Sequence, residues 1–338
     1  MSRLHCEKLF LLRSGVELSI FASFQDLPVA SSAVNFSALP LPGSRRDFLA
    51  KASDGGPVFL LQDSSPASYS PAIELKHISV QFHSTCRVTT VSGALNDQFA
   101  VISCDATAPE LHEVFICCLA AIVEQLPIDA GTSDLQRCVQ MLLDLFRTFG
   151  RPSNREVAGL WAELFVIAQS KNPAKVIQAW RSSQFERFDF SWRAGCLEVK
   201  AAVSEQRQHE FALEQLQPPL EGAGYVASVL LQALTGGVGI IDLANKIEAC
   251  IVGEPALRQK LWGNIAAALG SDFSERLDRR FDLSYAERGL ALYTMDDVPK
   301  PMHPSDLRIT AIRFRADLST VRSSLTRNSK EELNTLFI

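Results

Sequence analysis

Alternating polar and apolar positions near the middle of the chain predict a strand with charged side chains on one face. Over residues 196–200 the chain reads C-L-E-V-K. Side chains in a strand point to opposite faces in turn, so Glu198 and Lys200 share one face while Leu197 and Val199 share the other.

An acidic residue precedes this strand at a spacing that favours a hairpin. Asp189 stands between Phe188 and Phe190, nine positions before Glu198. A carboxylate in an aromatic strand is costly to bury unless it is paired or bound to metal. Residues 192–195 are few enough to form a tight turn, which predicts that Asp189 and Glu198 lie on neighbouring strands.

A helix is expected upstream of these strands. Residues 153–156 read S-N-R-E, a capping box that starts a helix. Apolar residues then recur at helical spacing, and Glu163 lies off the centre of that stripe, so that it can point toward the acidic strands. Downstream, residues 208–213 alternate again, and Gln215 follows, where a further helix can begin.

The remaining pattern predicts a β-rich N-terminal domain over residues 1–150. Apolar or alternating runs at 17–21, 58–61, 73–82 and 99–104 predict strands, and 110–125 and 133–149 predict two helices. The breaker G-R-P at 150–152 ends this domain.

Residues 151–270 are expected to hold the functional core and residues 271–338 a C-terminal α/β extension packed on the other parts. The run 225–234 predicts a buried strand. Residues 235–239, T-G-G-V-G, predict a turn before a helix near Ile240, since the lysine of a phosphate loop is absent. Strands are expected again at 290–294 and 309–316. The core therefore reads helix, three strands, helix, strand: an α/β (α+β) protein with a mixed sheet.

Composition favours a globular protein of the cytoplasm. Hydrophobic residues make up 47% and charged residues 21% of the 338 residues. No apolar run reaches the ~18 residues of a membrane span, and the start of the chain lacks the layout of a signal peptide. The eight cysteines form no C-x-x-C pair, which favours reduced thiols.

Charge is distributed unevenly between the two halves. Residues 1–150 hold 10 basic and 15 acidic residues, whereas residues 151–338 hold 23 of each. A neutral half can still present a local basic groove. Its candidates are Arg155, Arg187, Arg193 and Arg207, and His209 is a further candidate for a phosphate contact.

The residue types around Glu198 suit metal-assisted hydrolysis. Carboxylates such as Asp189 and Glu198 hold Mg²⁺ or Mn²⁺ through oxygen. Lys200 on the same face can orient a water molecule or stabilise charge on a phosphate. We therefore expect that loss of Lys200 abolishes cleavage and leaves folding nearly intact.

These motifs together resemble one protein family. The run G-L-W-A-E-L at 159–164, A-W at 179–180, D-F at 189–190, L-E-V-K at 197–200 and E-Q-L at 214–216 is similar to the PD-(D/E)XK phosphodiesterase superfamily. Within it, the chain resembles a bacterial family found beside DNA methyltransferases and ATPases in restriction-like gene clusters. The proline of the signature is replaced by Phe188.

The resemblance implies a restriction-endonuclease-like αβββαβ core and a Mg²⁺-dependent endodeoxyribonuclease acting in restriction–modification or phage defence. It assigns Glu163 to the metal site and Gln215 to its support. It also implies DNA, an ATPase and a methyltransferase as partners, and double-strand cutting would favour a homodimer. A non-catalytic DNA-binding or assembly subunit that keeps the fold is the alternative. A serine or cysteine hydrolase has little support, because the chain has neither a G-x-S-x-G elbow nor a convincing Cys/His arrangement.

Overall fold

The chain folds into two compact units, residues 1–148 and 149–338, each with its own apolar core. The structure is a computed structural model that describes residues 19–68, 70–75, 77–149, 156–183, 185–269, 277–302, 308–309, 311–325 and 327–337. No helix within these ranges is long and apolar enough to cross a membrane.

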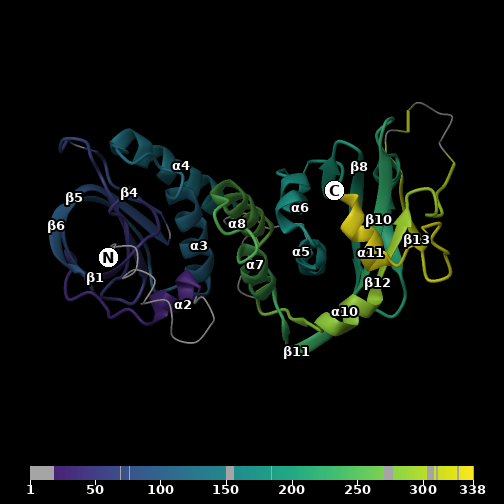
Figure 1. Cartoon of the computed structure of the whole chain (residues 1–338), viewed down its shortest axis with the longest axis horizontal. Coiled ribbons are helices and arrows are strands. Elements are labelled where there is room, and N and C mark those ends of the chain that lie inside the picture. The colour runs from purple at the N-terminus through teal and green to yellow at the C-terminus, as the bar shows by residue number, and fades with distance from the viewer. Residues whose placement is uncertain are drawn as a thin grey trace, which may run out of the picture. The chain divides into compact units, whose positions relative to one another are not determined.

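Strands of the N-terminal unit form a sheet that closes on itself (Figure 1). They are β1 (Asn35–Pro40), β2 (Phe48–Lys51), β3 (Pro57–Gln62), β4 (Ile73–Glu74), β5 (Ile78–Thr90) and β6 (Gly93–Cys104). Their order is β1-β2-β3-β6-β5-β4, and β1 also pairs in parallel with β5. Closure pairs strand edges that would otherwise be open to other chains.

Strand β3 is apolar on both faces because both are covered. Val58 and Leu60 lie in an interior cluster with Phe99. Phe59 points the opposite way and meets Phe115 of helix α3 (His112–Val123), with ring centroids 5.8 Å apart. Burial on both faces explains why this strand reads as a continuous apolar run.

The other helices of this unit are α2 (Ile20–Gln25), the short 3₁₀ helix η1 (Pro109–Leu111) and α4 (Thr132–Phe149). The strand expected at 17–21 is wrong where the structure describes it, because Ile20 and Phe21 are helical. The Ser19 hydroxyl accepts a hydrogen bond from the Ala22 amide and so caps this helix.

A four-stranded mixed sheet forms the centre of the C-terminal unit. Its strands are β7 (Phe190–Trp192), β8 (Gly195–Ala202), β10 (Ala223–Leu230) and β12 (Leu290–Thr294), in the order β12-β10-β8-β7. β8 and β10 are parallel, and the other two pairs are antiparallel. The predicted hairpin joins β7 to β8, and the predicted fold class, α+β with a mixed sheet, is confirmed.

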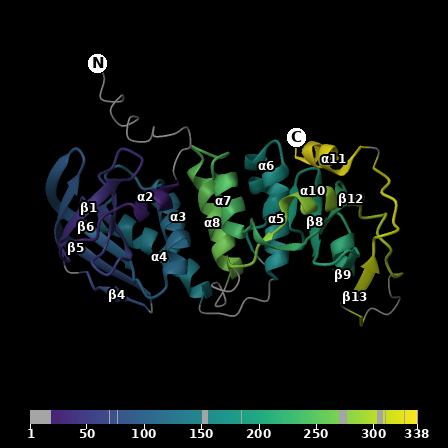
Figure 2. The ribbon, with the colours of Figure 1, turned by 90° about the horizontal axis from the view of Figure 1, so that it is seen from below.

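Helices cover one side of this sheet in layers (Figures 1 and 2). α5 (Val157–Gln169) and α6 (Pro173–Ala179) lie next to the strands, with α7 (Ile240–Glu248) and α8 (Pro255–Leu269) outside them. Helix α5 starts at Val157, and Glu156 is its extended N-cap residue without a side-chain cap, so the predicted capping box, which places Glu156 inside the first turn, is wrong. The other residues of the expected capping box, Ser153–Arg155, lie outside the described residues.

The third strand of the core leaves the main sheet. β9 (Gln208–Ala212) pairs with β13 (Arg313–Asp317) in a separate two-stranded sheet, so the three strands predicted in a row are not one sheet. The helix expected at Gln215 is only the 3₁₀ helix η2 (Leu213–Leu216). The glycine run is largely strand β11 (Ala233–Val238) and not a turn. Helix α10 (Leu283–Gly289) directly precedes β12, and helix α11 (Ser329–Leu336) follows β13.

Candidate active site

The chain that leaves helix α6 pairs with the entry to strand β7. Trp180 forms a bridge with Phe190, and their rings stack at 6.5 Å. The amide of Arg181 donates to the Asp189 carbonyl at 2.8 Å. This pairing places the Arg181 side chain beside the Asp189 carboxylate.

Glu163 is buried in helix α5, with 3% of its surface exposed. The Trp180 indole donates to its Oε2 at 2.6 Å, and the Arg181 guanidinium donates to its Oε1 at 3.0 Å. Hydrogen bonds from partners of this kind make burial of a carboxylate tolerable. Glu163 is therefore an internal acid of the site region and not a helix-edge residue.

Asp189 lies directly before β7 and serves as a junction between elements. Its Oδ1 is 3.0 Å from Arg181 Nη1, and its Oδ2 accepts from the Val199 amide of β8 at 2.8 Å. β7 pairs with β8 only as far as Leu197. The Asp189 carboxylate thus satisfies the next amide that points toward β7 and fixes itself against the strand that carries Glu198.

Glu198 and Lys200 meet on one face of β8, as the alternation predicted. Lys200 Nζ is 2.9 Å from Glu198 Oε1. Gln215 links both, because its amide nitrogen donates to Glu198 Oε1 at 2.6 Å and its oxygen accepts from Lys200 Nζ at 3.1 Å. The ammonium also lies 5.2 Å from the centroid of the Phe211 ring, within range of a cation–π contact.

The electrostatics of the site are those of buried acids held by two cations. Burial raises the pKa of Glu198, against the opposing effects of the Lys200 and Arg181 charges, and the nearby Glu163 raises it further. Burial lowers the pKa of Arg181, but the Asp189, Glu163 and Glu198 carboxylates outweigh it and the pKa is raised. Arg181 is therefore a permanent cation among three acids.

The donor chemistry fits a divalent cation, although no complete ligand set stands ready. Glu198 Oε2 is buried and has no hydrogen-bond partner among the described residues, which is costly unless a cation compensates it. Over the same ranges, no three acidic, histidine or cysteine side chains are arranged to hold one metal ion. Glu163 and Asp189 are bonded to Arg181 instead.

Of the predicted substrate contacts, the structure describes Arg193, Arg207 and His209. Arg155 lies outside the described residues, and Arg193 is exposed in the β7–β8 hairpin. The Arg207 guanidinium donates to Ser228 and to the Gly289 carbonyl. His209 is buried against the Ser228 hydroxyl at 2.8 Å. Their roles toward DNA stay predictions without a supporting contact.

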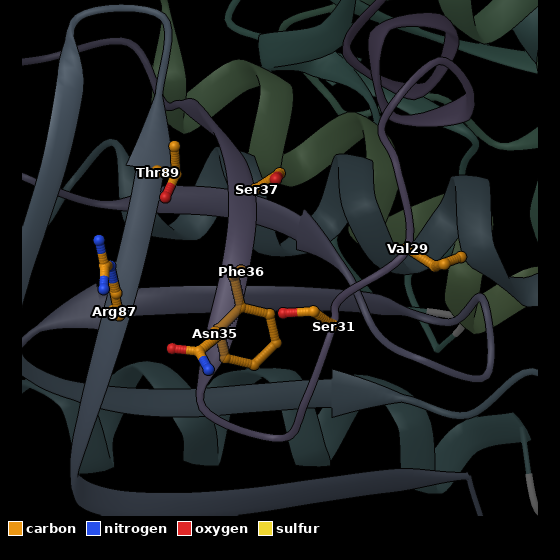
Figure 3. Close-up of a pocket in the computed structure, with 7 residues that line it drawn as sticks. All are labelled: Val29, Ser31, Asn35, Phe36, Ser37, Arg87 and Thr89. Atoms are coloured by element: carbon orange, nitrogen blue, oxygen red, sulfur yellow. The ribbon is translucent and has the colours of Figure 1, made fainter.

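A separate hollow of about 340 Å³ lies on the N-terminal unit (Figure 3). Residues of β1 and β5 line it together with the segment before β1: Val29, Ser31, Asn35, Phe36, Ser37, Arg87 and Thr89. It has one charged residue and no carboxylate among these seven, so it does not offer the donors of the site around Glu198.

Sequence reasoning missed two residues that organise the site, Trp180 and Arg181. The A-W motif at 179–180 pointed to this segment, but no periodicity or spacing indicated that Trp180 and Arg181 would bind Glu163. Only the pairing of Arg181 with Asp189 across seven intervening residues reveals it.

The fold and the site define the class of this protein. An acid at the entry to the first hairpin strand, Asp189, and E-x-K on the second strand, Glu198 to Lys200, are typical of PD-(D/E)XK phosphodiesterases. Over residues 22–319 the chain matches the model of the family described as "Putative PD-(D/E)XK family member (DUF4420)", and it belongs to that family. This confirms the resemblance found in the sequence. No curated protein and no solved structure matches the chain.

Proposed function

We propose that this protein is a metal-dependent endonuclease that hydrolyses phosphodiester bonds of DNA in bacterial restriction–modification or phage defence. The observation that carries the proposal is the buried Glu198 carboxylate. One of its oxygens is held by Lys200 and Gln215, while the other, Oε2, has no hydrogen-bond partner among the described residues.

Each residue of the site has a role in this proposal. Glu198, Asp189 and Glu163 would hold Mg²⁺ or Mn²⁺, which when bound would neutralise charge on the phosphate. Lys200 would orient the attacking water or donate to a phosphate oxygen. Gln215 would fix the positions of Lys200 and Glu198, since both ends of its amide are engaged.

The alternative is a non-catalytic DNA-binding or assembly subunit. One observation favours it: Arg181 joins two of the three acids, so the site is electrostatically satisfied in part without metal. In this case the closed barrel of the N-terminal unit would contact an ATPase or methyltransferase partner. Both functions place the protein in the cytoplasm, and both allow a homodimer.

Cleavage of plasmid DNA tests the proposal. Purified protein is incubated with supercoiled and with linear DNA in Mg²⁺, in Mn²⁺ or in EDTA. We expect cutting only with metal, and a loss of about 10²-fold or more in Glu198→Gln, comparable to loss of a key electrostatic group.

Glu210→Gln is the matched control for this experiment. Glu210 is an exposed glutamate of β9 that pairs with Arg315 on the surface, so activity should not change. Equal cleavage by Glu198→Gln and the wild type would refute the proposed role of Glu198. A wild type that neither cleaves DNA nor binds Mn²⁺ would favour the assembly subunit.

A further inference from the structure

We infer that Arg181 is an internal counter-cation of the acidic site and that it competes with a divalent metal for Asp189. The inference rests on the proposed function, because it takes Asp189 to be a metal ligand. It concerns a residue outside the motif that defines the family.

The geometry of the guanidinium supports this role. One terminal nitrogen, Nη2, is 3.0 Å from Glu163 Oε1, and the other, Nη1, is 3.0 Å from Asp189 Oδ1. The two acids come from different elements, helix α5 and the entry to β7. The planar fork of arginine thus bridges two acids that a metal would also bring together.

The charges explain why such a cation is needed. Glu163, Asp189 and Glu198 are each about 3% exposed. Buried carboxylates repel one another, and a nearby positive charge offsets this repulsion. Arg181 supplies that charge at a distance of 3.0 Å from two of them. A second cation at the same oxygens would meet strong repulsion, so metal and guanidinium exclude each other from Asp189.

The same contacts explain why the acidic side chains do not converge on one point. Within the described ranges no three acidic side chains are arranged to share an ion, and Asp189 Oδ1 is directed to Arg181. Metal binding therefore requires that Arg181 release Asp189.

Release is feasible because the backbone and the head group of Arg181 are held separately. Its amide donates to the Asp189 carbonyl, and its own carbonyl accepts from Asn264 at 2.7 Å. The side chain is 19% exposed. The head group can therefore leave Asp189 for solvent, or for a bound phosphate, while the main chain stays in place.

Titration of Mn²⁺ into metal-free protein, followed by calorimetry, tests the inference. Arg181→Gln removes the charge, and we expect it to bind Mn²⁺ about tenfold or more tightly than the wild type, because a close repulsive charge is lost. Arg181→Lys keeps the charge and should stay closer to the wild type. Arg193→Gln, which removes a cation from the exposed hairpin, controls for net charge and should leave the affinity unchanged.

Thermal unfolding provides the second measurement. In EDTA, Arg181→Gln should unfold at a lower temperature than the wild type and Arg193→Gln, since Glu163 and Asp189 lose their counter-cation. Saturating Mn²⁺ should raise its unfolding temperature more than that of the wild type. If Arg181→Gln does not fold in EDTA, refolding in Mn²⁺ should recover it, whereas NaCl of equal ionic strength should not.

The outcomes separate the inference from the proposed function. Weaker or equal Mn²⁺ binding by Arg181→Gln, with clear binding by the wild type, would overturn the competition and leave the nuclease proposal standing. Absence of Mn²⁺ binding in both proteins would overturn the inference and the proposed metal site together. Failure of Mn²⁺ to recover an unfolded Arg181→Gln would also overturn the competition.

Discussion

Replacement of Lys200 by methionine tests how the buried Glu198 carboxylate is held. Methionine keeps an apolar stem near Phe211 but removes the ammonium that lies 2.9 Å from Glu198 Oε1. Removing one partner of a buried ion pair costs about 3–5 kcal/mol. The Lys200 side chain is 17% exposed, so water replaces part of the contact. Hydration therefore lowers the expected cost below about 3–5 kcal/mol, and we expect a loss of about 2–3 kcal/mol in the free energy of unfolding at pH 7.5 in EDTA.

The loss should shrink as the pH falls. Burial already raises the pKa of Glu198 in the wild type, and removal of Lys200 raises it further. An acid whose folded pKa exceeds its unfolded pKa destabilises the fold above the unfolded value, and the penalty disappears as the pH approaches that value. Protonating an ordinary glutamate costs about 4 kcal/mol at pH 7.5 and about 2 kcal/mol at pH 5.5. The penalty for a charged Glu198 without Lys200 cannot exceed these figures at either pH. If it did, the folded variant would bind a proton at Glu198 and avoid the charge.

Urea unfolding at both pH values measures this effect in four proteins: the wild type, Lys200→Met, Glu198→Gln and the double variant. With Glu198 neutralised, the Lys200 substitution should cost less than about 1 kcal/mol, as expected when both partners of a pair are replaced. Lys246→Met, at an exposed lysine of α7, should change stability by less than about 0.5 kcal/mol. A Lys200→Met penalty that is independent of pH, or equally large in the Glu198→Gln background, would refute this reasoning.

Four further substitutions test the titration and the packing of residues around the site. Burial, with the nearby Lys200 and Arg207 charges, lowers the pKa of His209 to about 4. The free energy of unfolding of the wild type should therefore fall by on the order of 3 kcal/mol between pH 6.5 and pH 4, because the unfolded chain takes up a proton at His209 first. In His209→Gln, urea unfolding should show no such contribution to the pH dependence. Trp180→Phe leaves Glu163 without its indole donor and should lower the free energy of unfolding by about 1–3 kcal/mol, and by clearly less in a Glu163→Gln background. Gly195→Ala would place a Cβ 2.5 Å from the Ala223 carbonyl oxygen and should destabilise by about 1–3 kcal/mol in thermal unfolding. Gly159→Ala, whose Cβ meets nothing within 4 Å in helix α5, should gain up to about 1 kcal/mol; a loss there equal to that of Gly195→Ala would contradict the packing argument.

The elements that the sequence predicted correctly depend on local pattern. The alternation over residues 196–200 places Glu198 and Lys200 on one face, and the short turn after Trp192 makes a hairpin, because both properties follow from a few neighbouring residues.

The elements that were wrong depend on distant contacts. The run at Ile20 and Phe21 is too short for periodicity to separate a strand from a helix, and the Ser19 cap decides the matter. Strand β9 alternates as predicted, but its partner is β13, about a hundred residues away. No local pattern contains that information.

The consequence of removing Lys200 also had to be revised. Its place on the polar face of β8 suggested that folding would be nearly unaffected. The structure instead pairs Lys200 with a carboxylate that has a raised pKa and 3% exposure. A polar face of a strand is therefore not always a solvated face, and the sequence does not distinguish the two.

The site thus contains groups that are unfavourable for folding, and this bears on the choice between the two functions. Three carboxylates are buried, one oxygen of Glu198 has no hydrogen-bond partner in the described part of the chain, and two cations are recruited to hold them. Well-packed apolar residues in these positions would give a fold of equal or greater stability. A subunit that only assembles or binds DNA does not require buried acids, whereas the proposed nuclease requires acids that a metal can reach. Departures from the rules of stable folding of this kind are concentrated where function requires them, and for this reason the burial of Glu198 favours catalysis over assembly.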